Sequence, residues 1–202
     1  LIDIFEESKH ALDDLYEKNE FKRIHLAYSK IPGTAIQKKL KEKFNLDLIV
    51  SKDFTIAAEY ENFIWLKRSI RKADQGIFIY QREYTDTNML RPQYITDFRN
   101  EITELYLPGS LPKSYMVIES RLPLQNRVLN INGNYAIESR GLWRVENDFM
   151  GGPFVNIALL DEKNQNVVFL DGYIYHPSEN KRDYLKQLEA VFRSAKFIKT
   201  QQ

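Results

Sequence analysis

Hydrophobic positions at the start of the chain recur at helical spacing. Leu12, Leu15 and Tyr16 continue a stripe that begins at Leu1, while charged residues occupy the other faces. The pattern ends at the helix-breaking residues Ile31-Pro32-Gly33. The spacing therefore predicts one long helix with an apolar stripe.

A second helix is predicted directly after this break. Thr34 can cap its N-terminus, and Ile36, Leu40 and Phe44 recur at i, i+4 and i+8. We expect the two helices to form a hairpin that packs on a sheet. Residues 1–45 are accordingly interpreted as a helical N-terminal segment.

From Leu46 onward the hydrophobic period shifts toward two, which is typical of strands. Short runs rich in Ile, Val, Phe, Tyr and Trp are separated by polar, turn-like residues. The predicted strands cover residues 46–50, 54–58, 63–67, 76–84, 114–120, 127–132, 135–145, 154–161 and 167–176.

Two more helices interrupt or follow these strands. Pro92 suits a first helical turn, and Ile95, Phe98 and Ile102 share one stripe behind it. A last helix near the C-terminus buries a stripe that includes Leu188.

Short strand connections favour antiparallel pairing, and the helices do not alternate regularly with the strands. The predicted fold class is therefore α+β, with a twisted antiparallel sheet and helices packed on it. This α+β domain is expected to span residues 46–202.

Composition narrows the functions that need to be considered. The chain has 202 residues, with 29 Lys+Arg against 28 Asp+Glu. This nearly balanced charge argues against a nucleic-acid binder, which typically carries a basic surface. It lacks cysteine, glycine-rich phosphate loops and metal-ligand spacing among its three histidines. We expect no cofactor, no metal and no nucleic-acid partner, and no motif points to catalysis.

One stretch, residues 138–154, combines charge, aromatic side chains and glycines. Arg140 and Arg144 could bind an anionic group, and Trp143 could stack a ring. Glu146 and Asp148 could act as acid and base if their environments separated their pKa values. The simpler interpretation is structural: Trp143 belongs to the core and the arginines pair with nearby carboxylates.

The glycines of this stretch lead to two further expectations. Gly141 interrupts a strand pattern and predicts a β-bulge. Gly151-Gly152-Pro153 predicts a turn with positive φ that re-enters the next strand.

A second candidate surface is the strand around Tyr80. Alternation places Tyr80, Arg82 and Tyr84 on one face of the sheet. These side chains could form a ligand platform, or they could belong to a solvated strand.

Several strings in the second half of the chain are long enough to be specific. The clearest are Arg140-Gly141-Leu142-Trp143 and residues 148–154, Asp-Phe-Met-Gly-Gly-Pro-Phe. Others are residues 63–68, 76–80, 171–175 and 181–190. In these strings the chain resembles an uncharacterised family of Gram-negative bacterial proteins, catalogued as domain of unknown function 4837.

The resemblance implies a lipid-anchored envelope protein that faces the periplasm or the cell surface, because members of this family look like lipoproteins. Membrane contact is then expected only through a lipid anchor that this chain lacks. The chain begins at Leu1 within a predicted helix, so we expect a missing upstream region. Its strand-rich second half is also similar in outline to the Mog1/PsbP-like sandwich, an analogy that implies no function.

The expected function is a non-catalytic binding or interaction domain whose partner is an envelope protein or a small anionic ligand. The candidate binding residues are Arg140, Trp143, Arg144, Glu146, Asp148, Tyr80, Arg82 and Tyr84. The alternative is a hydrolase that acts on a cell-envelope polymer, with Glu146 and Asp148 as its carboxylates.

Overall fold

A computed structural model describes residues 2–70, 73–177 and 180–198 of the chain. Its helices are α1 (Ile2–Ser29), α2 (Thr34–Phe44), the 3₁₀ helix η1 (Thr87–Leu90), α3 (Pro92–Tyr106) and α4 (Arg182–Arg193). Its strands are β1 (Leu46–Asp47), β2 (Thr55–Tyr60), β3 (Phe63–Ile70), β4 (Ala73–Glu83), β5 (Met116–Ile118), β6 (Gln125–Ile131), β7 (Asn134–Val145), β8 (Gly151–Asp161), β9 (Asn166–Tyr175) and β10 (Lys196–Phe197).

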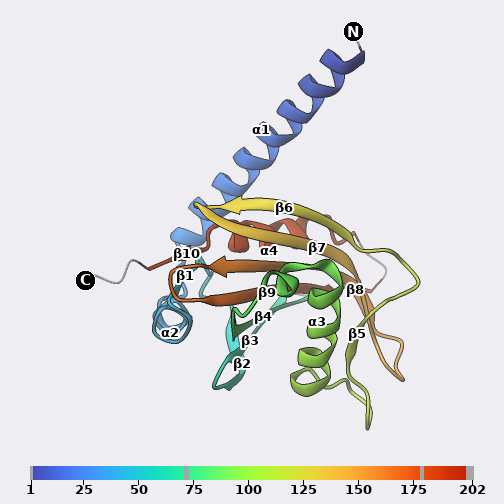
Figure 1. Ribbon diagram of the computed structural model, residues 1–202. Helices are drawn as coiled ribbons and strands as arrows, with labels where there is room; N and C mark the ends of the chain where they lie inside the picture. The colour runs from blue at the N-terminus through green and yellow to red at the C-terminus, as the bar shows by residue number, and fades with distance from the viewer. Residues whose placement is uncertain (1, 71–72, 178–179, 199–202) are drawn as a thin grey trace.

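A curved antiparallel sheet forms the centre of the described structure (Figure 1). Its strand order is β2-β3-β4-β9-β8-β7-β5. The long strand β7 has two partners on one side: β6 pairs with its first half and β5 with its end. β1 and β10 form a separate two-stranded ladder. The α+β class and the antiparallel sheet are therefore confirmed.

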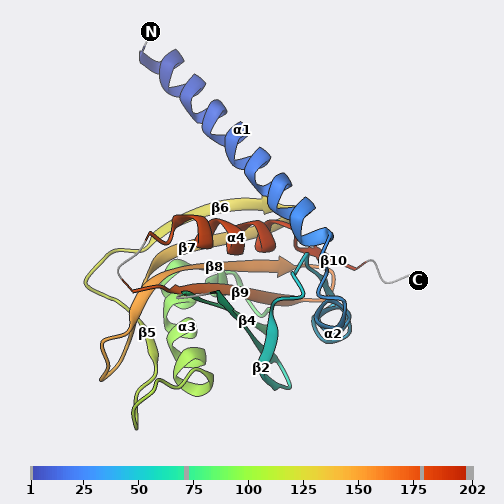
Figure 2. The ribbon, with the colours of Figure 1, turned by 180° about the vertical axis from the view of Figure 1, so that it is seen from behind.

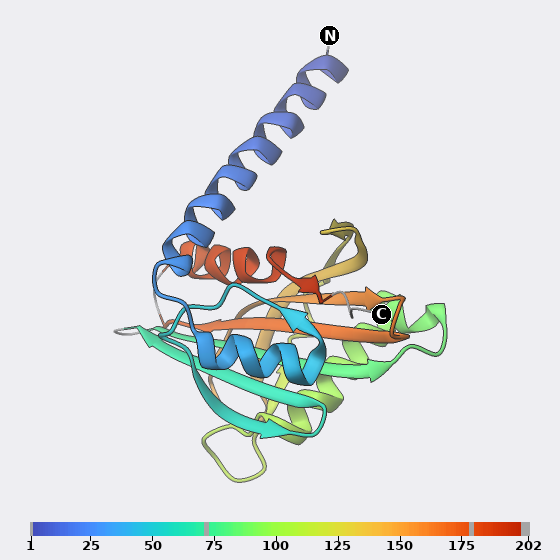
Figure 3. The same ribbon diagram turned by 90° about the vertical axis from the view of Figure 1, so that its left-hand side faces the viewer.

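Helices cover both faces of the sheet. α4 lies across one face and α3 across the opposite one (Figures 2 and 3). The α4 face also receives Leu40 and Phe44 of α2, which pack with Ile77 and Leu170 of the sheet. On the α3 face, Phe98 and Ile102 pack with Phe169 and other sheet residues. Two cores result, with the sheet between them.

Helix α1 projects away from this body (Figure 1). Its C-terminal part is docked, since Phe21 and Tyr28 are buried. Leu12, Leu15 and Tyr16 are 57–65% exposed, so the prediction that their stripe packs on the sheet is wrong. Only the C-terminal part of α1 is docked, with His25 and Tyr28 contacting Ala190 and Gln187 of α4, and the stripe lies on the part of the helix that extends beyond the sheet (Figure 1). Among the described residues, no helix combines the length and apolar character needed to cross a bilayer.

The glycines around the β7–β8 hairpin serve close packing. Gly141 pairs in regular register with Phe154, so the predicted bulge is wrong. Gly151 and Gly152 lie within β8, and the turn instead falls at residues 146–150, where Asn147 has φ of 61°. A Cβ atom on Gly152 would lie 2.0 Å from the carbonyl oxygen of Ile174, and this contact explains the glycine.

Candidate functional site

The predicted site residues of β7 lie on two faces of the sheet. Side chains alternate along a strand, so Arg140 and Arg144 share a face while Trp143 points the other way. Arg140 contacts Glu189 of α4, and Trp143 packs in the core beneath α3. The structure therefore places Arg140 and Trp143 on opposite faces of the sheet, where they do not line one common site.

Arg140 belongs to a buried ionic network on the α4 face. Its guanidinium donates to Glu138 at 2.6 Å and to Glu189 at 2.5 Å. Glu138 also accepts hydrogen bonds from Arg127 and Arg193. Burial acts to raise the pKa of Glu138, but the hydrogen bonds and the positive charges of Arg140 and Arg127 together outweigh it and hold the pKa below its usual value. Arg140 is thus neutralised by protein carboxylates.

Arg144, Glu146 and Asp148 lie at the β7–β8 turn. Arg144 forms an ion pair with Glu146 at 2.7 Å and lies 4.0 Å from Glu119. Asp148 accepts a hydrogen bond from the backbone N–H of Phe149. Neither Glu146 nor Asp148 lines a cavity among those found in the described part of the chain.

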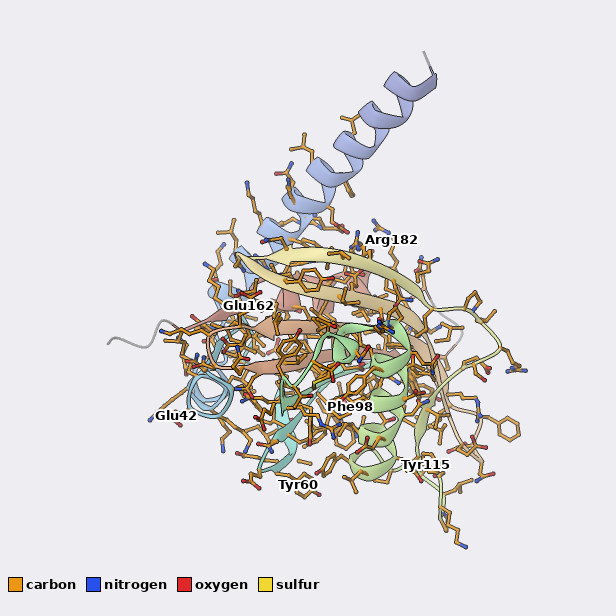
Figure 4. All side chains as sticks on the ribbon, viewed as in Figure 1. Glu42, Tyr60, Phe98, Tyr115, Glu162 and Arg182 are labelled. Atoms are coloured by element: carbon orange, nitrogen blue, oxygen red, sulfur yellow. The ribbon has the colours of Figure 1, made fainter. Side chains whose placement is uncertain are left out.

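The strand around Tyr80 faces α3, as alternation predicts. The Tyr80 ring lies 5.2 Å from Phe98 of α3, and the Arg82 guanidinium lies 5.1 Å from the same ring. Tyr84 packs against the same core. Phe98 is labelled beside α3 in Figure 4, and its ring lies 4.6 Å from Phe169 of β9. This surface is therefore largely occupied by the protein's own helix.

A cavity on the α3 face is the candidate site that we favour, because aromatic rings line it. It has a volume of about 290 Å³ and gathers residues of β3, β4, β5, β7 and β9, of the loop after α3 and of the β7–β8 turn. We call it the tryptophan cavity, because both tryptophans of the chain line it. Its lining residues are Trp65, Lys67, Asp74, Leu107, Pro108, Gly109, Ser110, Met116, Trp143, Val145, Met150, Tyr173 and Tyr175.

Four aromatic rings form a connected group in this cavity. The indole N–H of Trp65 donates to the Tyr173 hydroxyl at 3.1 Å. The Trp143 ring meets Tyr173 edge to face at 5.4 Å and lies 6.3 Å from Tyr175. Trp143 and Tyr173 are buried, whereas Trp65 and Tyr175 are half-buried and expose ring surface. Trp143 thus contributes to this cavity chiefly as a packed wall.

Charged and polar side chains surround the cavity mouth. Lys67 places its ammonium 4.1 Å from the centre of the Trp65 ring. Asp74 accepts a hydrogen bond from Ser69 at 2.6 Å. Pro108 and Ser110 are exposed at the same mouth, on a loop tied to the β7–β8 turn by the Glu146 N–H donating to the Tyr115 carbonyl. An apolar interior with a few polar groups at its opening is typical of ligand sites.

A buried ion pair lies next to this cavity. Arg99 of α3 donates to both carboxylate oxygens of Asp171 on β9, at 2.7 and 3.1 Å. Asn156 donates to the same carboxylate. Arg99 also contacts the sulfur of Met116, which lines the tryptophan cavity. The pair fixes α3 against the sheet beneath the cavity wall.

Most residues of this cavity are not among the site residues predicted from the sequence. Trp65 and Lys67 lie two positions apart on one strand, and so do Tyr173 and Tyr175. Strand alternation alone therefore places each pair on one face of the sheet. What the sequence could not show is that β3, β4 and β9 are neighbours. The strand order brings these pairs together.

Other cavities give less support for a binding site. A larger cavity of about 790 Å³ lies between the β6–β7 and β8–β9 turns, near Glu162 (Figure 4). Its lining ends at Ile198, the last residue that the structure describes. No group of three His, Asp or Glu side chains in the described ranges could hold a metal ion.

Known proteins similar to this chain include solved structures and one protein family. The solved structures similar to this chain include a point mutant of the protein Mog1, with 11% identity, coverage of 77% of this chain and 92% of that chain, and a TM-score of 0.48. Another is the Ran-binding protein Mog1p of Saccharomyces cerevisiae, with 10% identity, coverage of 76% and 90%, and a TM-score of 0.49.

A search of curated proteins found no match. The family described as "Domain of unknown function (DUF4837)" matches residues 33–194, which contain α2, the large sheet and the tryptophan cavity. The chain therefore belongs to the DUF4837 family.

Proposed function

We propose that this chain is a non-catalytic binding domain and that the tryptophan cavity is its binding site. The observation that carries the proposal is a cavity of about 290 Å³ with aromatic walls and a charged mouth, lined by five strands, the loop after α3 and the β7–β8 turn. Sites held on strands are positioned more rigidly than sites on loops.

We also propose that the domain acts at the cell envelope, as part of a lipoprotein of Gram-negative bacteria. The support for this placement is the resemblance described above, whose members look like lipoproteins. The natural full-length protein tests it: the proposal expects partition into the detergent phase, and loss of that partition when the acceptor cysteine is replaced. Recovery in the aqueous phase would contradict the lipid anchor.

Binding of an anion by Arg140 and Arg144 is not supported by the geometry, because carboxylates neutralise both guanidinium groups. The hydrolase alternative has no specific observation in its favour either. Glu146 is engaged by Arg144, and Asp148 accepts from a neighbouring backbone N–H. General acid–base catalysis requires carboxyl groups within reach of a bound substrate.

A variant that fills the cavity mouth tests the binding proposal. Ser110 is exposed and lines the mouth, so Ser110→Phe should obstruct it without disturbing the core. The immobilised chain would be incubated with envelope extract from the cells that make it. We expect retained material to be lost with Ser110→Phe and kept with Ser120→Phe, an exposed position that does not line the cavity. Equal retention by both variants would refute the assignment of the site.

A further inference from the structure

The tryptophan cavity contains a hydrogen-bond donor that the protein does not use. Tyr173 is 6% exposed, and its hydroxyl oxygen accepts from Trp65. Its own proton finds no acceptor among the described residues. Because burial raises the pKa of Tyr173, this hydroxyl stays protonated at neutral pH. A buried donor directed at a cavity calls for an acceptor oxygen on a bound molecule.

The mouth offers a donor and an acceptor of opposite charge. Asp74 uses one carboxylate oxygen for Ser69, and its other oxygen has no partner in the part of the chain described. The Lys67 ammonium lies over the Trp65 ring and makes no ion pair with a described carboxylate. Lys67 and Asp74 occupy diagonal positions on the β3–β4 ladder, since Lys67 pairs with Gly76 and Asp74 with Ser69. The mouth therefore has no net charge to favour an ion.

The size of the cavity limits the ligand. Ligand pockets typically run from about 300 to 1,000 Å³, so a volume of about 290 Å³ suits about one ring. The half-buried rings of Trp65 and Tyr175 offer apolar surface, and their π faces attract weakly positive C–H groups. A suitable ligand is a ring with one apolar face and several groups that both donate and accept hydrogen bonds.

We infer that the tryptophan cavity binds a single sugar ring, either free or at the end of a glycan. The C–H face of a sugar packs on aromatic side chains, and its hydroxyls both donate and accept. One hydroxyl accepts from Tyr173, another donates to Asp74, and a third accepts from Lys67. This inference rests on the proposed function and names the ligand class of the same site.

Fluorine NMR of the 202-residue chain labelled with 5-fluorotryptophan provides the test. The chain has two tryptophans, both in the cavity, so both signals report on its occupancy. Glucose, galactose and N-acetylglucosamine would be titrated as probes, with cyclohexanol as a ring that carries one hydroxyl. We expect saturable shifts of both signals with at least one sugar. Asp74→Asn should weaken that binding about tenfold, because the sugar hydroxyl then donates to a neutral amide oxygen instead of a charged carboxylate.

The matched control is Asp97→Asn on α3, an exposed carboxylate outside the cavity, which should leave the sugar affinity unchanged. Shifts with cyclohexanol and none with any sugar would overturn the saccharide assignment while keeping the cavity as a ligand site. Sugar binding that is equal in Asp74→Asn and the original chain would also overturn it. Failure of the proposed function is distinguishable, since it would appear as equal retention of envelope material by Ser110→Phe and Ser120→Phe.

Discussion

The ring of Tyr173 lies directly over Gly76 on the neighbouring strand. The two residues are register partners in the β4–β9 ladder, and a Cβ atom on Gly76 would lie 2.1 Å from the Tyr173 ring. Only glycine leaves space for this ring at the cavity wall. Gly76 therefore helps to form the wall of the tryptophan cavity.

Gly76→Ala should consequently displace Tyr173 and destabilise the fold by about 1–3 kcal/mol, the usual effect of overpacking. Urea unfolding of the variant would measure the loss. In a Tyr173→Leu background the same substitution should have a smaller effect, because the ring that causes the clash is absent. An equal loss in both backgrounds would show that the contact is not the cause.

Arg99 and Asp171 form a bidentate ion pair with side chains at most 1% exposed. Removing one partner leaves a buried charge without compensation, so Arg99→Met or Asp171→Leu alone should destabilise the fold by about 3–5 kcal/mol. The double variant should lose less than the sum of the single variants. A double-mutant cycle by denaturant unfolding measures this coupling, and strict additivity would contradict it.

Trp143 is 2% exposed, and its indole N–H donates to the carbonyl of Ile174. Trp143→Ala should therefore destabilise the fold by about 3–5 kcal/mol through loss of packing. Chemical denaturation monitored by circular dichroism measures the loss, and Leu142→Ala at an exposed neighbouring position is the control. If both variants unfold at the same denaturant concentration, Trp143 is not a core residue.

Glu138 links stability to pH. Its folded-state pKa lies below the ordinary value of 4.5, because the hydrogen bonds and the positive charges of Arg140 and Arg127 together outweigh the opposing effect of burial. A lowered pKa means that the ionised form stabilises the fold above about pH 4.5, and that this contribution is lost as pH falls through the folded-state pKa.

Glu138→Gln should thus destabilise the fold by about 3 kcal/mol at neutral pH and by progressively less below pH 4.5. Urea unfolding across this pH range measures the difference. The exposed pair of Glu42 with Lys38 supplies a control, since Glu42→Gln should change stability little at any pH. A Glu138→Gln effect independent of pH would rule out the ionic explanation.

Local periodicity was enough to predict the strands and most helices, since β3, β7 and β9 each show alternation or a continuous apolar run. It also predicted the antiparallel α+β class. The site was harder, because its residues come from strands distant in sequence, such as Trp65 and Tyr173. Arg140 and Trp143 are close in sequence and were therefore grouped in one candidate site, but their side chains lie on opposite faces of the sheet. Strand order, which pairs β4 with β9, is set by long-range packing.

The tryptophan cavity is the place where we propose that this domain binds its ligand. The most direct measurement is fluorine NMR of the 5-fluorotryptophan-labelled chain during titration with envelope extract from the cells that make it. We expect saturable shifts of the Trp65 and Trp143 signals that are absent in Ser110→Phe. Unchanged tryptophan signals under conditions where the immobilised chain demonstrably retains material would contradict it.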